Sequence, residues 1–449
     1  MWSSVTSVVQ EVLTNAGTSA ASVAGVGISN QRETTIVWDR ETGRPVHNAI
    51  VWQDQRTASW CATLSHDAGT LLQQKTGLVV NPYFSASKLR WLLDHVPAGQ
   101  RMAETGKLAF GTVDSWLIWK MTAGEKHVTD VTNASRTLLF NIHTGTWDPE
   151  LLDIFSIPPS MLPNVCSSSQ VYGEVHPGLL SDPTPVCGLA GDQQAALFGQ
   201  MCTRPGTVKN TYGTGCFMLM QTGTNPVASQ NNLLTTPAWQ IGQETKYALE
   251  GSVFTAGAVV QWLRDNLGLI PSASKIETLA ATVPNTEGVY FVPAFTGLGA
   301  PHWDPTARGT IIGLSQTSTA AHIARAALES LAYQSADVLS AMESDSCISI
   351  TELRADGGAA INNLLMQFQA DILGVPVVRS TTTESTALGA AYLAGLAVGF
   401  WSTPDDLKSQ RHIDRVFEPT MSDGERGDLR HGWAKAAGRA RHWIANEKG

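Results

Sequence analysis

The 449-residue chain has few charged residues and no block of like charges. Asp, Glu, Lys and Arg make up 15% of the sequence, and the formal net charge is −9. A nucleic-acid-binding surface needs a concentration of Lys and Arg to neutralise phosphates. The sequence therefore predicts no nucleic-acid partner. An anionic substrate would have to be neutralised locally, by backbone amides, a few basic side chains or a metal ion.

Paired cysteines, a signal peptide and membrane-length apolar runs are lacking as well. The six cysteines are scattered and form no C-x-x-C pair, which is typical of reduced thiols in an intracellular protein. The N-terminal residues contain no basic segment followed by an apolar core, as a signal peptide would. The longest apolar run, 387–401, is too short and too rich in glycine to span a membrane. We expect a cytoplasmic protein without a membrane span.

Two common nucleotide-binding motifs are also missing. No G-x-G-x-x-G occurs, and the nearest approach to a P-loop, Gly69–Thr76, has Gln74 in place of its second glycine. That segment also lies within a helical pattern of apolar residues. Any nucleotide site must therefore be of another type.

The length and the order of the apolar segments predict two α/β domains. A chain of this length is too long for one hydrophobic core. Strand-like and helix-like segments alternate in both halves, and Pro205-Gly206 interrupts the chain between them. We expect domains at 1–202 and 203–449 that face each other across a cleft.

The segment around Asp192 is predicted to turn from a buried strand into a helix. Val186–Ala190 is apolar with a β-branched start, and Gln193–Phe198 is rich in helix formers. Ligands of open α/β sheets bind outside the carboxyl ends of strands. Asp192 would then point into the cleft and could remove a hydroxyl proton. Alternatively, it only caps the helix, since Asp is a preferred N-cap residue.

Three further side chains are candidates for binding a small polar ligand. Arg32 and Glu33 follow a predicted strand and could grip the vicinal hydroxyls of a polyol, or they could form an ordinary surface ion pair. Tyr83 lies in a turn before a helix, where it could present its hydroxyl to a ligand or be a half-buried structural tyrosine. Asn48–Gln53 is predicted to be a strand.

Two glycine-rich turns could approach phosphates. Thr211–Gly215 separates two strand-like segments and could form an anion nest, to which Thr214 adds a hydroxyl. The alternative is a plain tight hairpin turn. Leu353–Gly358 is a strand running into a glycine turn, with a helix leaving near Asn362. Adjacent glycines there would let the backbone approach a base or a phosphate.

Several stretches of the chain resemble the FGGY family of carbohydrate kinases, and the resemblance covers nearly the whole chain. Two of them, Tyr83–His95 and Gly309–Glu329, resemble the general signatures of the family. The other matching stretches are Gly27–Glu33, Asn48–Gln53, Gly111–Asp114, Ala190–Gln194, Asn210–Phe217, Pro293–Pro301 and Asp356–Gly358 with Asn362. The fold implied is the α/β, actin-like (ribonuclease-H-like) two-domain ATPase fold.

The combination of acceptor-binding residues is more specific than the family signatures. It resembles the members of the family that phosphorylate glycerol, and it implies ATP-dependent formation of sn-glycerol 3-phosphate. Asp192 would be the general base and would lie close to Mg²⁺. The residues implied to bind glycerol are Arg32, Glu33, Trp52, Tyr83, Asp192, Gln193 and Phe217, with Trp52 and Phe217 packing against its carbons.

The same resemblance implies a nucleotide site in the second half. Thr214 and Gly215 would contact the transferring phosphates, Gly257 and Gln261 the phosphates or the ribose, and Gly358 and Asn362 would hold the nucleotide. The implied cofactors are ATP and Mg²⁺. We expect glycerol and ATP as partners and a homo-oligomer, either a dimer or a tetramer.

The resemblance departs from the family pattern in two places. Relatives open with a Gly-Thr-Thr-Ser hairpin that supplies the first phosphate loop, so we expect an N-terminal domain incomplete at its start. A second departure, at Leu179–Pro183, leaves inhibition by a sugar bisphosphate in doubt. Two alternatives therefore stay open: a catalytically impaired or non-catalytic remnant that still binds glycerol or nucleotide, and a kinase for another polyol or ketose.

Overall fold

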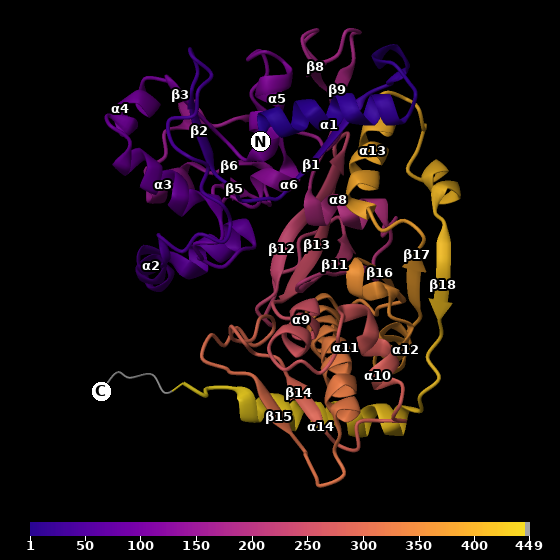
Figure 1. Cartoon of the computed structure of the whole chain (residues 1–449). Coiled ribbons are helices and arrows are strands. Elements are labelled where there is room, and N and C mark those ends of the chain that lie inside the picture. The colour runs from indigo at the N-terminus through magenta and orange to yellow at the C-terminus, as the bar shows by residue number, and fades with distance from the viewer. Residues whose placement is uncertain (445–449) are drawn as a thin grey trace.

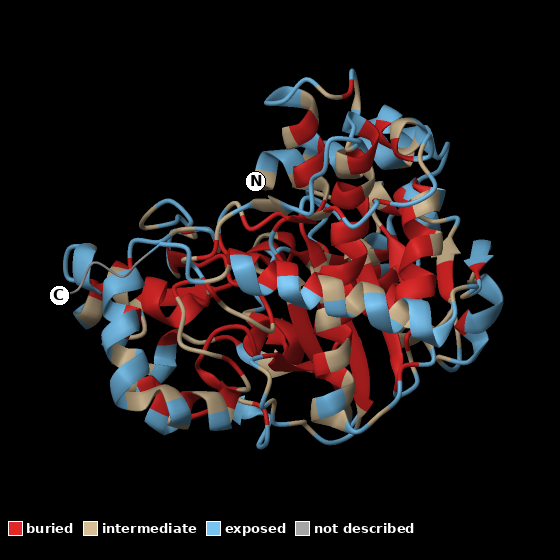
Figure 2. Ribbon diagram, turned by 90° about the horizontal axis from the view of Figure 1, so that it is seen from below, coloured by how far each residue is buried: buried red, intermediate tan, exposed pale blue. Residues whose placement is uncertain are grey.

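A computed structural model describes residues 1–444, and it has one large mixed sheet with helices packed around it (Figure 1). The strand order is β1-β9-β8-β12-β13-β11-β10-β16-β17-β18. Figure 2 shows the strands and the inner faces of the helices buried, with exposed residues on the outer faces. None of the helices in the described residues is long and apolar enough to cross a bilayer.

The first half of the chain, residues 1–202, contributes three strands to this sheet and several small peripheral strand pairs. Its helices are α1 Trp2–Asn15, α2 Ala58–Thr76, α3 Ser85–His95, α4 Gly99–Glu104, α5 Val113–Met121, α6 Val131–Ala134, α7 Pro149–Phe155 and α8 Asp192–Gly199. Its strands are β1 Val26–Asn30, β2 Ile36–Asp39, β3 Leu108–Gly111, β4 Val128–Asp130, β5 Phe140–Asn141, β6 Thr146–Trp147, β7 Asn164–Cys166, β8 Ser169–Glu174 and β9 Pro185–Gly191.

The second half, from residue 203 onward, contributes the other seven strands of the large sheet. Its helices are α9 Gly257–Asp265, α10 Ile276–Ala280, α11 Ala320–Ser346, α12 Asn363–Leu373, α13 Ser385–Ala397 and α14 Asp423–Ala440. Its strands are β10 Thr207–Tyr212, β11 Cys216–Gly223, β12 Leu234–Ile241, β13 Glu244–Val253, β14 Tyr290–Val292, β15 Thr310–Ile312, β16 Glu352–Asp356, β17 Val377–Ser380 and β18 Ile413–Phe417. We propose that the domain boundary lies in the loop between α8 and β10.

Two parallel strand pairs bring chemically useful loops together. β1 pairs with β9 so that Asn30 lies opposite Gly191, and β10 pairs with β16 so that Thr211 lies opposite Asp356. The carboxyl ends of parallel strands meet at the same edge of a sheet. The residues after Asn30 therefore emerge beside Asp192, and the turn after Tyr212 emerges beside Gly357.

The two halves are joined closely through α13. Although α13 belongs to the second half, it packs on β1, β9 and α8 of the first half. Glycines make this approach possible: a Cβ on Gly27 would lie 2.3 Å from the carbonyl oxygen of Ala390, and one on Gly188 would lie 2.5 Å from the nitrogen of Ala394. The many small residues of α13 allow the same close approach from its side.

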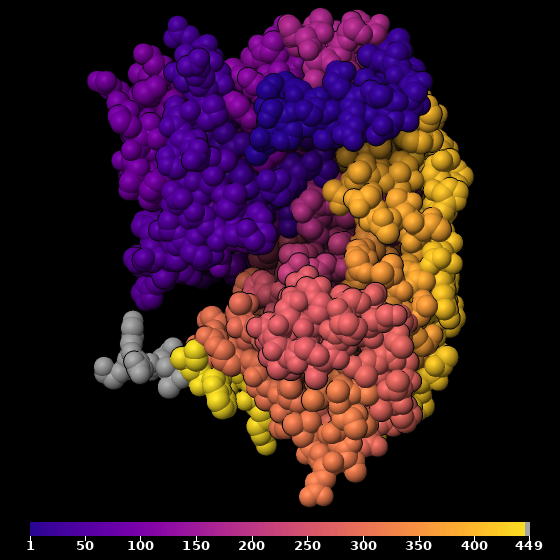
Figure 3. All heavy atoms as spheres, in the orientation of Figure 1, coloured from indigo at the N-terminus to yellow at the C-terminus, as the bar shows by residue number. Residues whose placement is uncertain are grey.

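A recess separates the two halves on the face seen in Figure 3. Its walls are the indigo and purple first half and the salmon segment around α9 and α10, with the magenta segment near β9 and α8 exposed between them. The predicted two-part α/β arrangement with an intervening cleft is therefore present.

One predicted element differs from the structure. Asn48–Gln53 is not a strand, because within it only Ile50 forms a β-bridge, with Thr35. The last helix, α14, begins at Asp423, where the Ser422 hydroxyl caps it by accepting from the Glu425 amide.

Candidate active site

Asp192 occupies the turn that the sequence predicts, but it is not the helix cap. β9 ends at Gly191, which is the N-cap of α8, and Asp192 is the first residue of the helix. Its Oδ1 accepts from the Gln193 backbone N–H at 2.8 Å, and its Oδ2 accepts from Gln193 Nε2 at 3.1 Å. The side chain is 34% exposed. A carboxylate so placed can still accept a hydrogen bond from a ligand.

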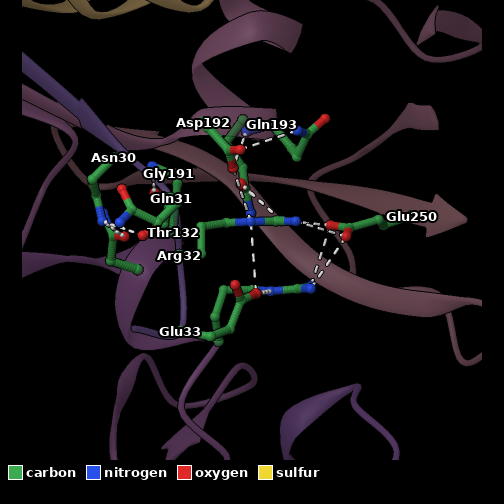
Figure 4. A network of polar contacts seen from close by, with 12 residues as sticks. Asn30, Gln31, Arg32, Glu33, Thr132, Gly191, Asp192, Gln193 and Glu250 are labelled. Carbon is green, nitrogen blue, oxygen red and sulfur yellow. Dashed lines mark hydrogen bonds and ion pairs between the residues drawn. The ribbon is translucent and has the colours of Figure 1, made fainter. Parts of the chain in front are cut away.

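Arg32 reaches Asp192 from the neighbouring strand end. Its Nε lies 3.2 Å from Asp192 Oδ1 and 3.7 Å from Glu33 Oε1 (Figure 4). A Cβ on Gly191 would lie 2.6 Å from Arg32 Cγ, so a glycine is needed where the arginine crosses the turn. Arg32 and Glu33 are only 2% and 1% exposed. The alternative of an ordinary surface ion pair is therefore wrong.

The backbone at Glu33 is in an unusual conformation. Its φ is +61°, and the Thr34 N–H donates to the Arg32 carbonyl at 2.6 Å, which closes a γ-turn. Such turns with positive φ are rare and strained for a residue with a side chain. Buried hydrogen bonds hold this one, because Ser85 Oγ donates to the Glu33 carbonyl at 3.0 Å. The turn directs the Glu33 carboxylate back toward the two arginines.

Arg136 and Glu250 complete this charged network, and the sequence analysis missed both. Glu250 accepts from Arg32 at 2.7 and 2.9 Å and from Arg136 at 3.2 and 3.1 Å, while Arg136 Nε donates to Glu33 at 2.7 Å. Burial alone would raise the pKa of Glu250, but the Arg136 and Arg32 guanidiniums outweigh it and lower the pKa to about 2. Two arginines and two carboxylates thus neutralise each other inside the protein.

Trp52 and Tyr83 form an aromatic pair near this network. Their ring centroids are 5.3 Å apart at an interplanar angle of 62°. Burial, followed by the charge of Glu33, raises the pKa of the Tyr83 hydroxyl, so Tyr83 keeps its proton and can donate it to a hydrogen bond. The two rings offer an apolar surface to the carbon chain of a small ligand, with one hydroxyl beside it.

Gln193 is bound by Lys209, a buried lysine that the sequence analysis also missed. Lys209 on β10 is fully buried and donates to Gln193 Oε1 and, at 3.0 Å, to Thr211 Oγ1. Phe217 on β11 lies opposite Thr211 in the antiparallel register. Burial lowers the pKa of the Lys209 ammonium group, and the nearby charges of Asp356 and Asp192 oppose this shift. Lys209 therefore lies between the Asp192 network and the glycine turn after β16.

A cavity of about 500 Å³ lies beside the turn between β10 and β11. Five of the six residues predicted to bind a nucleotide line it: Thr214, Gly257, Gln261, Gly358 and Asn362. The sixth, Gly215, is not part of the cavity wall and instead closes the turn, because its carbonyl accepts from the Gly213 N–H at 2.9 Å. Asn362 has a second function as the N-cap of α12.

The turn is fixed by the start of α9. The Gly257 N–H donates to the Gly213 carbonyl at 3.0 Å, and the Ala256 N–H donates to the Thr214 carbonyl at 2.8 Å. These bonds satisfy two of the amides that a helix N-terminus leaves without intrahelical partners. They hold the Thr214 side chain on the wall of the cavity.

We expect Gly257→Ala to weaken selectively the binding of the ATP that the family resemblance implies. The added Cβ would lie 2.6 Å from the Gly213 carbonyl oxygen, so the turn that carries Thr214 must shift. Overpacking of this kind costs about 1–3 kcal/mol, and if this cost falls on the nucleotide-binding turn the KM for ATP should rise roughly 5- to 150-fold. Initial rates at varied ATP measure the effect. Gly438→Ala, where a Cβ meets nothing within 4 Å, is the control and should match the wild type.

Comparison with known proteins places these features in one family. The N-terminal domain profile of the FGGY family of carbohydrate kinases matches residues 1–199, and its C-terminal domain profile matches residues 208–398. The chain is 60% identical to a glycerol kinase of Trichlorobacter lovleyi, over 99% of this chain and 90% of that protein. It is 59% identical to a glycerol kinase of Deinococcus radiodurans, over 99% of this chain and 88% of that protein.

Solved structures show the same similarity. The crystal structure of Plasmodium falciparum glycerol kinase with ADP superposes with a TM-score of 0.89 at 42% identity, covering 93% of this chain and 83% of that one. A ligand-bound xylulose kinase from Lactobacillus acidophilus gives a TM-score of 0.87 at 23% identity, covering 98% of this chain and 88% of that one. The second likeness concerns the fold alone.

Proposed function

Because the chain belongs to the FGGY family of carbohydrate kinases, and within it to the glycerol kinases, we propose that it phosphorylates glycerol with ATP to form sn-glycerol 3-phosphate. The observation that carries the proposal is the position of Asp192. Its partly exposed carboxylate is in contact with Arg32, which also contacts Glu33, and Lys209 connects the neighbouring Gln193 to the strand that leads into the nucleotide cavity.

Each residue of the acceptor site has a part in this reaction. Asp192 accepts the proton of the attacking hydroxyl, since an ionised carboxylate acts only as an acceptor. Arg32 and Glu33 bind the neighbouring hydroxyls as donor and acceptor, and Tyr83 donates a further hydrogen bond. Trp52 and Phe217 lie against the carbons. Phosphoryl transfer depends mainly on such positioning and on charge neutralisation.

The nucleotide site completes the arrangement. We assign Gly358 and Asn362 to the nucleotide, Gly257 and Gln261 to its phosphates or ribose, and Thr214 and Gly215 to the transferring phosphates. Glycine-rich turns bring backbone amides close to phosphate oxygens. The recess between the two halves would let the chain enclose both substrates and keep water away from the phosphoryl group.

Asp192 is also the candidate ligand for Mg²⁺. Its donors are carboxylate oxygens on a partly exposed side chain, which suit a hard cation. Mg²⁺ commonly binds through one or two carboxylates together with substrate phosphates and water, so one such residue is sufficient. When bound, the ion neutralises phosphate charge.

The direct test is an assay of glycerol-dependent ADP release by the purified chain. We expect turnover with glycerol, and slower turnover with longer polyols and ketoses offered at the same concentration. Faster turnover with one of those acceptors would show that this acceptor, and not glycerol, is the preferred substrate. Binding of ADP and glycerol without any release of new ADP would identify a non-catalytic binding protein instead.

We expect Arg32→Ala to raise the KM for glycerol much more than the KM for ATP. The change removes the guanidinium that contacts Asp192, Glu33 and Glu250, whereas the nucleotide cavity contains no part of Arg32. Initial rates measured while each substrate is varied in turn separate the two constants. An equal rise in the KM for glycerol and the KM for ATP would show that Arg32 does not act in glycerol binding.

A further inference from the structure

A second cavity, of about 600 Å³, lies at the opposite end of β10 and β16 from the nucleotide cavity. Thr207 at the start of β10 and Glu352 at the start of β16 line it, whereas Tyr212 and Gly358, at or beyond the ends of these strands, line the nucleotide cavity. Strands of five or six residues span about 15–20 Å. We call this second space the basal cavity, and it is separate from the active site.

The basal cavity is lined by an excess of cationic side chains. Arg204, Arg354, Lys408 and Arg411 line it, together with a single carboxylate, Glu352. Lys408 also forms an ion pair with Asp405 at 2.6 Å. Four cations against these two carboxylates leave a local charge of +2, in a chain whose formal net charge is −9.

The arginines around Glu352 are incompletely neutralised. Arg354 Nε donates to Glu352 at 2.7 Å, a second guanidinium nitrogen donates to the same oxygen, and Arg411 Nη1 lies 4.0 Å from it. One carboxylate is thus shared by two guanidiniums. Burial, followed by the charge of Arg354, lowers the pKa of Arg411, as expected where two cations lie close together.

Arg354 is held rigidly at the cavity wall. It is 8% exposed, and Nη1 donates to the carbonyl of Gln200, just past the end of α8. A guanidinium has five N–H groups, and the three hydrogen bonds to Glu352 and Gln200 use three of them. A preorganised arginine with N–H groups to spare is suited to the oxygens of a phosphate group.

We infer that the basal cavity binds a dianionic oxyanion of the phosphate type, either inorganic phosphate or the phosphoryl group of a small molecule. A charge of −2 balances the local charge of +2. Arg204 is exposed and Arg411 is 20% exposed, so both have N–H groups that can reach a ligand in the cavity. The inference is independent of the proposed function, because none of these residues belongs to the acceptor site or to the nucleotide cavity.

Calorimetric titration of the full chain tests the inference. Inorganic phosphate, as the probe, is titrated in magnesium-free buffer at constant ionic strength, with the nucleotide cavity saturated by ADP. We expect one site in the wild type and at least a tenfold loss of affinity, about 1.4 kcal/mol, in Arg204→Gln/Arg411→Gln. The charge-matched control Arg101→Gln/Arg439→Gln, on exposed positions elsewhere, should keep the wild-type affinity.

Inorganic phosphate and phosphoglycolate, titrated separately, distinguish a free anion from a phosphorylated small molecule. Both double variants should retain wild-type glycerol-dependent ADP release, which shows that they fold. Equal affinity of the wild type and Arg204→Gln/Arg411→Gln would overturn the inference. Loss of binding when ADP saturates the nucleotide cavity would also overturn the inference. So would the absence of binding by the wild type at about 10 mM probe, because that concentration detects a site with a binding free energy of about 2.7 kcal/mol.

Discussion

Asp192→Asn should lower kcat for glycerol phosphorylation by at least about 10²-fold, the lower limit for loss of a general base. The amide keeps the size of the side chain and can still accept from the Gln193 N–H, so the turn between β9 and α8 is preserved. What disappears is the ability to take up a proton. The KM for ATP should change little, because Asp192 is not part of the nucleotide cavity wall.

Steady-state rates and thermal unfolding together check this prediction. The side chain is 34% exposed, so the melting temperature of Asp192→Asn should stay close to that of the wild type. Asp405→Asn, which alters an exposed ion pair far along the sequence, serves as the control for loss of a carboxylate. A kcat within a few-fold of the wild type would show that Asp192 has no part in proton transfer.

Glu250→Gln should be the most destabilising single substitution in the acceptor site. Glu250 accepts hydrogen bonds from both Arg32 and Arg136, and all three side chains are buried. Removing one partner of a buried ion network leaves uncompensated charge and costs about 3–5 kcal/mol. We expect a marked fall in the melting temperature and a loss of glycerol binding, because Arg32 loses the carboxylate that holds it.

Glu244→Gln on the same strand is the matched control. Glu244 pairs with Lys246 at 2.7 Å but is 61% exposed, and exposed pairs contribute at most about 1 kcal/mol. Equal shifts in melting temperature for the two variants would contradict the importance of the buried network.

The pH dependence of stability gives a second check on Glu250. The folded-state pKa of Glu250 is lowered to about 2. The contribution of its ionised form to the free energy of unfolding is therefore present above pH 4.5 and is lost as the pH falls toward 2. The stability difference between the wild type and Glu250→Gln should therefore narrow below pH 4.5.

Local sequence patterns were sufficient to predict the turns of the active site. The apolar strand before Asp192, the glycine turn at 211–215 and the turn at 353–358 are each encoded within a few residues, and the structure contains all three. The position of Arg32 and Glu33 after a predicted strand made them candidates as well, and the family resemblance added Gly257 and Gln261, which line the cavity beside the turn. What these patterns could not supply was the set of partners that hold Arg32 and Glu33 in place.

Those partners depend on contacts between distant segments. Arg136 is separated from Glu33 by 103 residues, and Glu250 from Arg32 by 218. One signal was available in the sequence, because Lys209 and Glu250 are charged residues next to apolar ones, in segments that form buried strands, and a buried charge must find a partner. The sequence marks such residues as unusual, but only the fold shows which opposite charges they meet.

The packing of α13 on the first half has a consequence for synthesis of the protein on the ribosome. Gly27 and Gly188 pack closely against Ala390 and Ala394, which are translated about 200 residues after Gly188. At a translation rate of about 5–20 residues per second, the surface formed by β1 and β9 stays uncovered for roughly 10–40 seconds before α13 has been synthesised. During that interval the nascent chain exposes a strip of unprotected backbone and apolar side chains, which a holding chaperone would be expected to shield.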